Sequence, residues 1–176
     1  MHKLLLNQEI YTEVIQTHVP NTQHYLWIVT ADIKDMHVHM GRSFEPFLRL
    51  LADLVQKGVS VRLIHAKEPG PRFREDFDQF PVLIDNELFE RILCPRVHTK
   101  AIIIDNRLGF LGSPNLTGAG MGAKHEDKRN FEAGFLFDAP HDIKRLSEWV
   151  DQLYLGNFCQ QCKRREYCPD PIADLF

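Results

Sequence analysis

One stretch in the middle of the chain reads VHTKAIIIDNRLGFLGSPN and spans residues 97–115. It contains two apolar runs, Ala101–Ile104 and Leu108–Leu111, joined by Asp105, Asn106 and Arg107. Short apolar runs with a brief polar connection are typical of two adjacent buried strands. Polar residues stand directly before the first run and directly after the second, so any chemistry of this segment flanks the strand pair.

Helical and extended patterns alternate on either side of this stretch. Apolar residues at i, i+3, i+4, i+7 and i+8 predict a helix that follows Pro46 and runs from Phe47 to Val55. Gly58 ends it, and alternating apolar residues over 59–63 predict a strand. Similar patterns predict a helix over 9–19, strands over 25–29 and 133–137, a surface connection over 68–79 and a helix over 143–153. Together they predict an α/β fold, in which helices flank a mixed β-sheet.

Length and composition limit the number of domains and the class of protein. The 176 residues are enough for one sizeable core and few for two, so we expect one domain over residues 1–156 with a packed tail over 157–176. An apolar fraction of 44% and a charged fraction of 26% argue against disorder. Leu4–Leu6 form too short a run for a signal sequence or a membrane span, so we expect a cytoplasmic protein without a membrane anchor.

Four polar residues gather at the ends of the two predicted strands. His98 and Lys100 are two residues apart where the first strand begins, so their side chains should project from the same face. After the second strand, Gly112 permits close backbone approach, while Ser113 and Asn115 supply polar side chains. An imidazole, an ammonium, a hydroxyl and an amide at one edge predict a phosphate pocket.

The complete spacing is His98-x-Lys100, then Asp105, then Gly112-Ser113-x-Asn115, and it resembles the signature of the phospholipase D superfamily. The resemblance covers residues 97–115 closely and extends to the segment 130–132. It implies that residues 1–156 form a phospholipase D-like catalytic domain. A lone His-x-Lys pair arises readily by chance, and the Gly, Ser and Asn in register are what set this pair apart.

The resemblance also implies a mechanism. His98 would attack phosphorus to give a phosphohistidine, and a second histidine would protonate the leaving oxygen and later activate water. Because the chain carries one copy of the motif, that second histidine would be His98 of another protomer, which implies a homodimer with the active site at its interface. Lys100, Asn115 and Ser113 would bind the phosphate oxygens, and catalysis would need no cofactor or metal ion.

Two acidic residues receive different roles. Glu132 resembles the acidic residue that orients an imidazole in similar nucleases. Asp105 lies seven residues from His98, which is an odd number in a strand, and falls in the predicted turn. We therefore expect Asp105 to point away from the phosphate and to have a structural role.

A basic loop follows the motif. The formal net charge of −3 gives no general attraction to nucleic acid, so binding would need a local patch. Lys124, Lys128 and Arg129 could contact phosphates that flank the reacting one. Glu126 and Asp127 interrupt the run, and an ordinary solvated loop is an equal alternative.

The cysteines form a compact pattern near the C-terminal end. Cys159-x2-Cys162-x5-Cys168, with the distant Cys94, could hold a structural zinc ion or an iron–sulfur cluster. The pattern resembles the iron–sulfur staple of some nucleases with a different fold. The alternatives are a mobile tail with free thiols and, less favoured in the cytosol, disulfides.

Three functions follow in order of preference. The first is a metal-independent endonuclease that hydrolyses DNA or RNA through a phosphohistidine. The second is a phospholipid phosphodiesterase of the cardiolipin type, because the same chemistry serves lipid head groups. The third is a nucleic-acid-binding module without turnover, which the intact set of His98, Lys100 and Asn115 disfavours.

Overall fold

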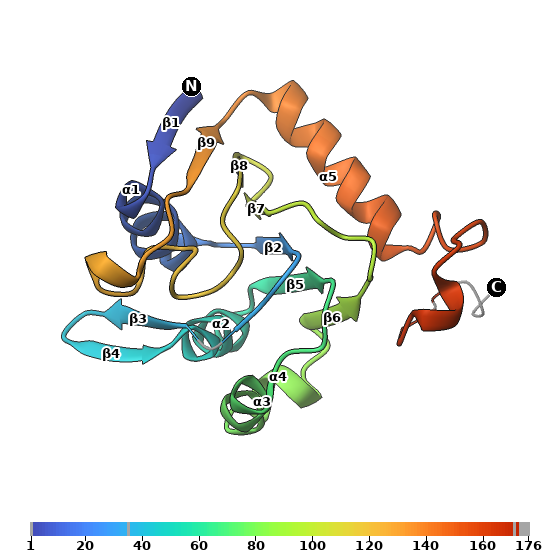
Figure 1. Cartoon of the computed structure of the whole chain (residues 1–176), viewed down its shortest axis with the longest axis horizontal. Helices are drawn as coiled ribbons and strands as arrows, with labels where there is room; N and C mark the ends of the chain where they lie inside the picture. The colour runs from blue at the N-terminus through green and yellow to red at the C-terminus, as the bar shows by residue number, and fades with distance from the viewer. Residues whose placement is uncertain (1, 35, 171, 173–176) are drawn as a thin grey trace.

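A seven-stranded sheet forms the centre of the protein (Figure 1). The structure is a computed structural model and describes residues 2–34, 36–170 and 172. Along the sheet the strands are β1 (His2–Leu6), β9 (Ala133–Phe137), β8 (Leu108–Gly112), β7 (Ala101–Ile104), β2 (Tyr25–Thr30), β5 (Ser60–His65) and β6 (Phe89–Leu93). Strands β2, β5 and β6 run parallel, whereas the other neighbouring pairs are antiparallel. The predicted mixed sheet is therefore confirmed.

The β7–β8 hairpin forms where the two apolar runs predicted it. Ile104 pairs with Leu108, and the Arg107 N–H donates to the Ile104 carbonyl at 2.9 Å. Asp105 and Asn106 have positive φ angles of 53° and 50°. These are the residue types that tolerate this conformation in a tight hairpin turn.

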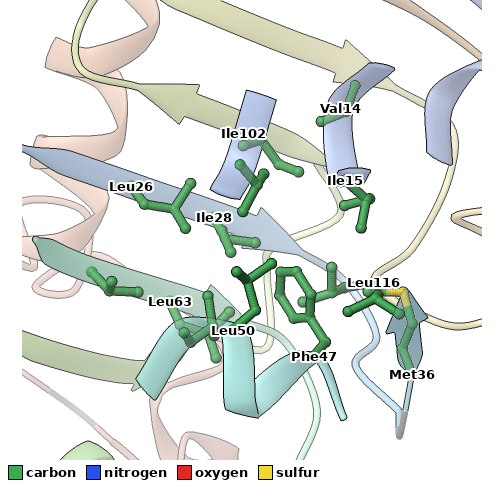
Figure 2. Close-up of a cluster of buried hydrophobic side chains, with 14 of the residues drawn as sticks. Val14, Ile15, Leu26, Ile28, Met36, Phe47, Leu50, Leu63, Ile102 and Leu116 are labelled. Carbon is green, nitrogen blue, oxygen red and sulfur yellow. The ribbon is translucent and has the colours of Figure 1, made fainter. Parts of the chain in front are cut away.

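Helices cover both faces of the sheet, as predicted. One face packs against α2 (Phe47–Gln56) and against α1 (Gln8–Ile10) with its π-helical continuation (Tyr11–His18). Figure 2 shows Phe47 and Leu50 of α2 beside Ile28 and Leu63 of the strands. The other face packs against α5 (Pro140–Tyr154), which buries Ile143 and Val150. The smaller elements are a β-hairpin of β3 (His37–Met40) and β4 (Ser43–Pro46), 3-10 turns at 19–21, 126–128 and 165–167, and α4 (Val82–Asp85).

The predicted surface connection over 68–79 is wrong, because this segment contains α3 (Pro71–Asp78). Pro71 begins the helix, and Phe73 and Phe77 lie one turn apart with their rings stacked at 6.1 Å. The sequence pattern did not predict this helix, because the segment contains prolines and many charged residues and the helix has only a narrow apolar face.

The tail beyond α5 packs against the connection between β6 and β7. The Leu93 N–H donates to the Asp170 carboxylate at 3.3 Å, and the Arg164 guanidinium donates to the Pro95 carbonyl at 3.0 Å. Residues 171 and 173–176 of the predicted tail lie outside the described residues. No helix in the described part of the chain has the length and apolar character needed to cross a membrane.

Candidate active site

His98 and Lys100 meet at the end of the sheet where β7 begins. The Lys100 backbone is fixed there because its carbonyl accepts from the Gly112 N–H at 3.1 Å. The Lys100 residue is only 8% exposed, whereas His98 is exposed. The Lys100 Nζ lies 3.5 Å from both ring nitrogens of His98. A largely buried ammonium group is thus held beside an imidazole that solvent and substrate can reach.

Gly112 lets β8 and β9 approach closely at this edge. A Cβ on Gly112 would lie 2.8 Å from the Ala133 carbonyl oxygen and 2.9 Å from the Gly134 Cα. The next residue, Ser113, donates its hydroxyl hydrogen to Glu132 and accepts from the Ala133 N–H at 3.1 Å. Ser113 is therefore held between the start of β9 and a carboxylate.

Glu132 has different partners from those that the resemblance implied. One carboxylate oxygen accepts from Ser113, and the other accepts from the Asn130 amide at 3.1 Å. Its backbone N–H donates to the Asn7 side chain at 3.0 Å, which fixes the segment against the start of α1. In the described residues of one protomer, Glu132 orients Ser113 and Asn130, and it has no hydrogen bond to His98.

Asn115 is held by the loop that follows β2. Its side-chain oxygen accepts from the Asp32 N–H at 3.1 Å, and the next residue, Leu116, donates its N–H to the Thr30 hydroxyl at 3.0 Å. Because the oxygen of the amide is engaged, its N–H donors are oriented away from Asp32 and are available to an anion. This orientation suits a phosphate-binding residue.

A groove of about 600 Å³ lies beside Asn115. Lys34, Arg72 and Lys124 bring positive charge to its lining, although Lys34 also pairs with Asp32 at 3.7 Å. Lys34 and Arg72 were not predicted, and Arg72 falls in the segment that was misread as a connection. The one signal in the sequence was that Arg72 directly follows Pro71, a residue type that favours the first turn of a helix.

The three basic loop residues have different environments. Lys124 lines the groove, and Lys128 is exposed. Arg129 instead braces the loop, because its guanidinium donates to the Lys124 carbonyl at 2.5 Å and to the Gln8 side chain at 2.8 Å. Of the three, Lys124 is the best placed to contact a substrate bound at Asn115.

Asp105 lies at the far end of β7 from His98. Its carboxylate accepts from the backbone N–H groups of Gln23, His24 and Tyr25 at 2.7–3.2 Å. Partial burial raises the pKa of Asp105, but these hydrogen bonds outweigh it and hold the pKa below its usual value. The carboxylate thus joins the β7–β8 turn to the start of β2 and does not face the site.

A second cavity, of about 200 Å³, is lined by His98 and by all four cysteines. We call it the cysteine pocket. The Arg164 backbone N–H and the Arg96 side chain lower the pKa of Cys162. Burial raises the pKa of Cys168, and the neighbouring thiols Cys94 and Cys159 raise it further. Across the residues that the structure describes, no group of three or more His, Cys, Asp or Glu side chains is placed to hold a metal ion.

A mixed sheet with an imidazole–ammonium pair at its edge, next to a Gly-Ser-x-Asn turn, defines a phospholipase D-like protein. The family model described as cardiolipin synthase, PLD-like domain, matches residues 15–154. The chain belongs to this family of the phospholipase D superfamily. A comparison with curated proteins found no match.

Solved structures share the fold at low sequence identity. NucT from Helicobacter pylori is 15% identical with a TM-score of 0.62, and the match covers 86% of this chain and 95% of NucT. Nuc from Salmonella typhimurium, a phospholipase D family member, is 15% identical with a TM-score of 0.58, over 88% and 95% of the two chains. Phosphatidylserine synthase from Haemophilus influenzae is 17% identical with a TM-score of 0.59, over 86% of this chain and 38% of the synthase.

Proposed function

We propose that this phospholipase D-like protein is a nuclease that hydrolyses DNA or RNA through a phosphohistidine at His98, without a catalytic metal ion. The observation that carries the proposal is the exposed His98 imidazole beside the nearly buried Lys100 ammonium, 3.5 Å away. A phosphodiester at this position would meet a nucleophile and a fixed positive charge together.

The reaction proceeds in two balanced displacements. A ring nitrogen of His98 forms a bond to phosphorus as the bond to the leaving oxygen breaks, and an imidazolium gives that oxygen its proton. The imidazole that gave this proton, which belongs to the second histidine, is now neutral and takes a proton from water. The water oxygen then attacks phosphorus and releases His98. Lys100 and the Asn115 amide stabilise the charge on the non-bridging oxygens in both steps.

The second imidazole would come from a second copy of the chain. One copy supplies a single His-x-Lys motif, and an exposed apolar strip borders the site. Leu4, Phe135 and Leu111 are directly opposite one another on β1, β9 and β8, so they share one face, and they are 50%, 51% and 44% exposed. A strip of this kind supports an interface between two copies.

The groove beside Asn115 favours a polynucleotide. It is lined by Asn115, a proposed phosphate ligand, and it carries Arg72 and Lys124, which can contact the flanking phosphates that a nucleic acid has. Because the net charge is −3, this local charge is what would attract a polyanion. A phospholipid diester, which the family description suggests, presents fewer phosphates to such a groove.

The first experiment compares substrates in the presence of a chelator. Labelled single-stranded DNA, duplex DNA, RNA and cardiolipin vesicles are incubated with wild type, His98→Ala and the matched control His125→Ala. His125 is exposed and pairs with Asp127 in the loop after the motif, so its loss removes a histidine away from the β7 edge. We expect nucleic-acid cleavage by wild type and His125→Ala, and none by His98→Ala.

The other outcomes are equally informative. Turnover of cardiolipin alone would replace the nuclease proposal with a lipid phosphodiesterase. Tight binding of nucleic acid without turnover would indicate a binding module. Trapping a labelled acid-labile, base-stable phosphoprotein that is absent in His98→Ala would support the covalent step.

Mixing the two proteins tests the shared site. If each active site needs His98 from both copies, mixed dimers are inactive. After subunit exchange in an equal mixture of wild type and His98→Ala, activity should fall to about one quarter of that of the same total amount of wild type. A fall to only one half would show that each chain acts alone.

A further inference from the structure

All four cysteines of the chain line one pocket, although they come from distant parts of the sequence. Cys94 follows directly after β6, and Cys159, Cys162 and Cys168 lie in the tail beyond α5. None of the four is in a disulfide. Chance placement of four thiols around one cavity is improbable for a residue type that makes up so little of the chain.

The tail is held to the sheet at this pocket. Besides the contacts of Asp170 with Leu93 and of Arg164 with Pro95, the Cys168 thiol lies 3.9 Å from the Leu93 carbonyl. Gly156, which has a positive φ of 71°, turns the chain back at the end of α5. The cysteine spacing and this turn together bring the thiols to the end of β6.

A single metal ion and an iron–sulfur cluster require different arrangements of four thiols. Around one zinc ion, four thiolates at about 2.3 Å from the metal converge on one point. Among the described residues no group of three His, Cys, Asp or Glu side chains is placed to hold a metal ion as it stands, and the four thiols line a cavity of about 200 Å³. In an iron–sulfur cluster the thiolates are shared among several irons, with inorganic sulfide between them, so the ring of thiols is wider.

The remaining lining of the pocket also suits a cluster. Trp149, Leu153 and Phe158 supply an apolar wall, and Arg96 and Arg164 supply positive charge beside the thiols. Thiolate ligands and inorganic sulfide carry negative charge, which nearby guanidinium groups offset. An apolar wall limits access of water to the irons.

We propose that Cys94, Cys159, Cys162 and Cys168 ligate an iron–sulfur cluster in the cysteine pocket. The cluster joins the tail to the segment that leads from β6 to His98, which lines the same pocket. Its role is structural, because the reaction at His98 needs no electron transfer. The proposal is independent of the substrate on which His98 acts.

The test is the metal content of the full-length protein purified without oxygen, then reconstituted with ferrous iron and sulfide. We expect iron and acid-labile sulfide in equal amounts, with broad visible absorbance that dithionite bleaches. Cys94→Ser and Cys162→Ser should each lose most of the iron and absorbance. The matched control Gln161→Ala, an exposed residue between two of the ligands, should retain both.

Two results would overturn the proposal. Zinc without iron in the purified protein, with no visible absorbance after reconstitution, would show a single-ion site. If all four thiols of the native protein react freely with a thiol reagent after reconstitution, the pocket holds no metal. The wild-type metal analysis decides among these outcomes even if the cysteine variants fold poorly.

Discussion

Substitutions of Asp105 test whether this residue has a structural or a catalytic role. The carboxylate accepts hydrogen bonds from three consecutive backbone N–H groups, those of Gln23, His24 and Tyr25. Hydrogen bonds to a charged group contribute about 1.5–3 kcal/mol each. Because the three donor residues are exposed, water replaces part of the loss. We expect Asp105→Gly to lower the free energy of unfolding by roughly 2–3 kcal/mol.

The backbone conformation gives this experiment an internal check. Asp105 has a φ of 53°, which glycine adopts freely, whereas alanine there costs about 1 kcal/mol more. Asp105→Ala should therefore be less stable than Asp105→Gly by that amount. Asp105→Asn, which tolerates the same φ and keeps one acceptor oxygen, should be the most stable of the three.

The assays are urea unfolding and turnover at a temperature well below the midpoint of unfolding. The pKa of Asp105 is lowered in the folded state. Its contribution to the free energy of unfolding is therefore present above the ordinary aspartate pKa of 3.8 and is lost as the pH falls through the folded-state pKa. The stability difference from Asp105→Asn should shrink in that acidic range. Loss of turnover in a fully folded Asp105→Asn protein would refute the structural role.

The remaining predictions concern the edge of the site, the groove and the interface. Gly112→Ala would place a Cβ 2.8 Å from the Ala133 carbonyl, and we expect a loss of about 2 kcal/mol in urea unfolding together with reduced turnover. Lys124→Ala should weaken nucleic-acid binding and lower its dependence on salt in a fluorescence-anisotropy titration, without changing stability. Arg129→Ala should mainly lower the melting temperature, since Arg129 holds the loop in place. If Lys124→Ala and Arg129→Ala weakened binding equally and neither changed stability, the separate roles given to Lys124 and Arg129 would be wrong. Phe135→Glu should convert a dimer to a monomer in sedimentation experiments, and a monomeric wild type would exclude the proposed interface.

The sequence revealed those elements whose apolar pattern was strong. Strand β7 is a continuous apolar run because all four of its residues are buried, so both of its faces are covered, and β8 buries Gly109 and Phe110 beside it. Helix α2 was equally clear, since one whole face of it packs on the sheet. In contrast, β1 buries only Leu5 and β6 has mostly half-buried residues, so neither edge strand shows a regular pattern.

The residues of the candidate site also differed in how well the sequence predicted them. His98, Lys100, Ser113 and Asn115 are close in sequence to the two central strands, so the strand pattern was enough to predict that they flank the ends of those strands. The groove residues Lys34 and Arg72 come from other loops, and only the folded chain brings them to Asn115. The hydrogen bond from Ser113 to Glu132 could not be predicted from the sequence either, because it depends on how β9 pairs with β8 at Gly112.

Both ends of the segment that carries the site are anchored, and this bears on how the chemistry is achieved. At one end Asp105 ties the turn after β7 to three backbone donors of the segment entering β2. At the other end, the tail packs on Leu93 and Pro95, a few residues before His98. The proposed catalysis by a fixed ammonium and amide requires that these groups do not reorganise as charge develops on phosphorus. Lys100 meets this requirement because the strand that carries it is held at both ends and because the residue is almost fully buried, while His98 keeps the exposure that the proposed attack on phosphorus demands.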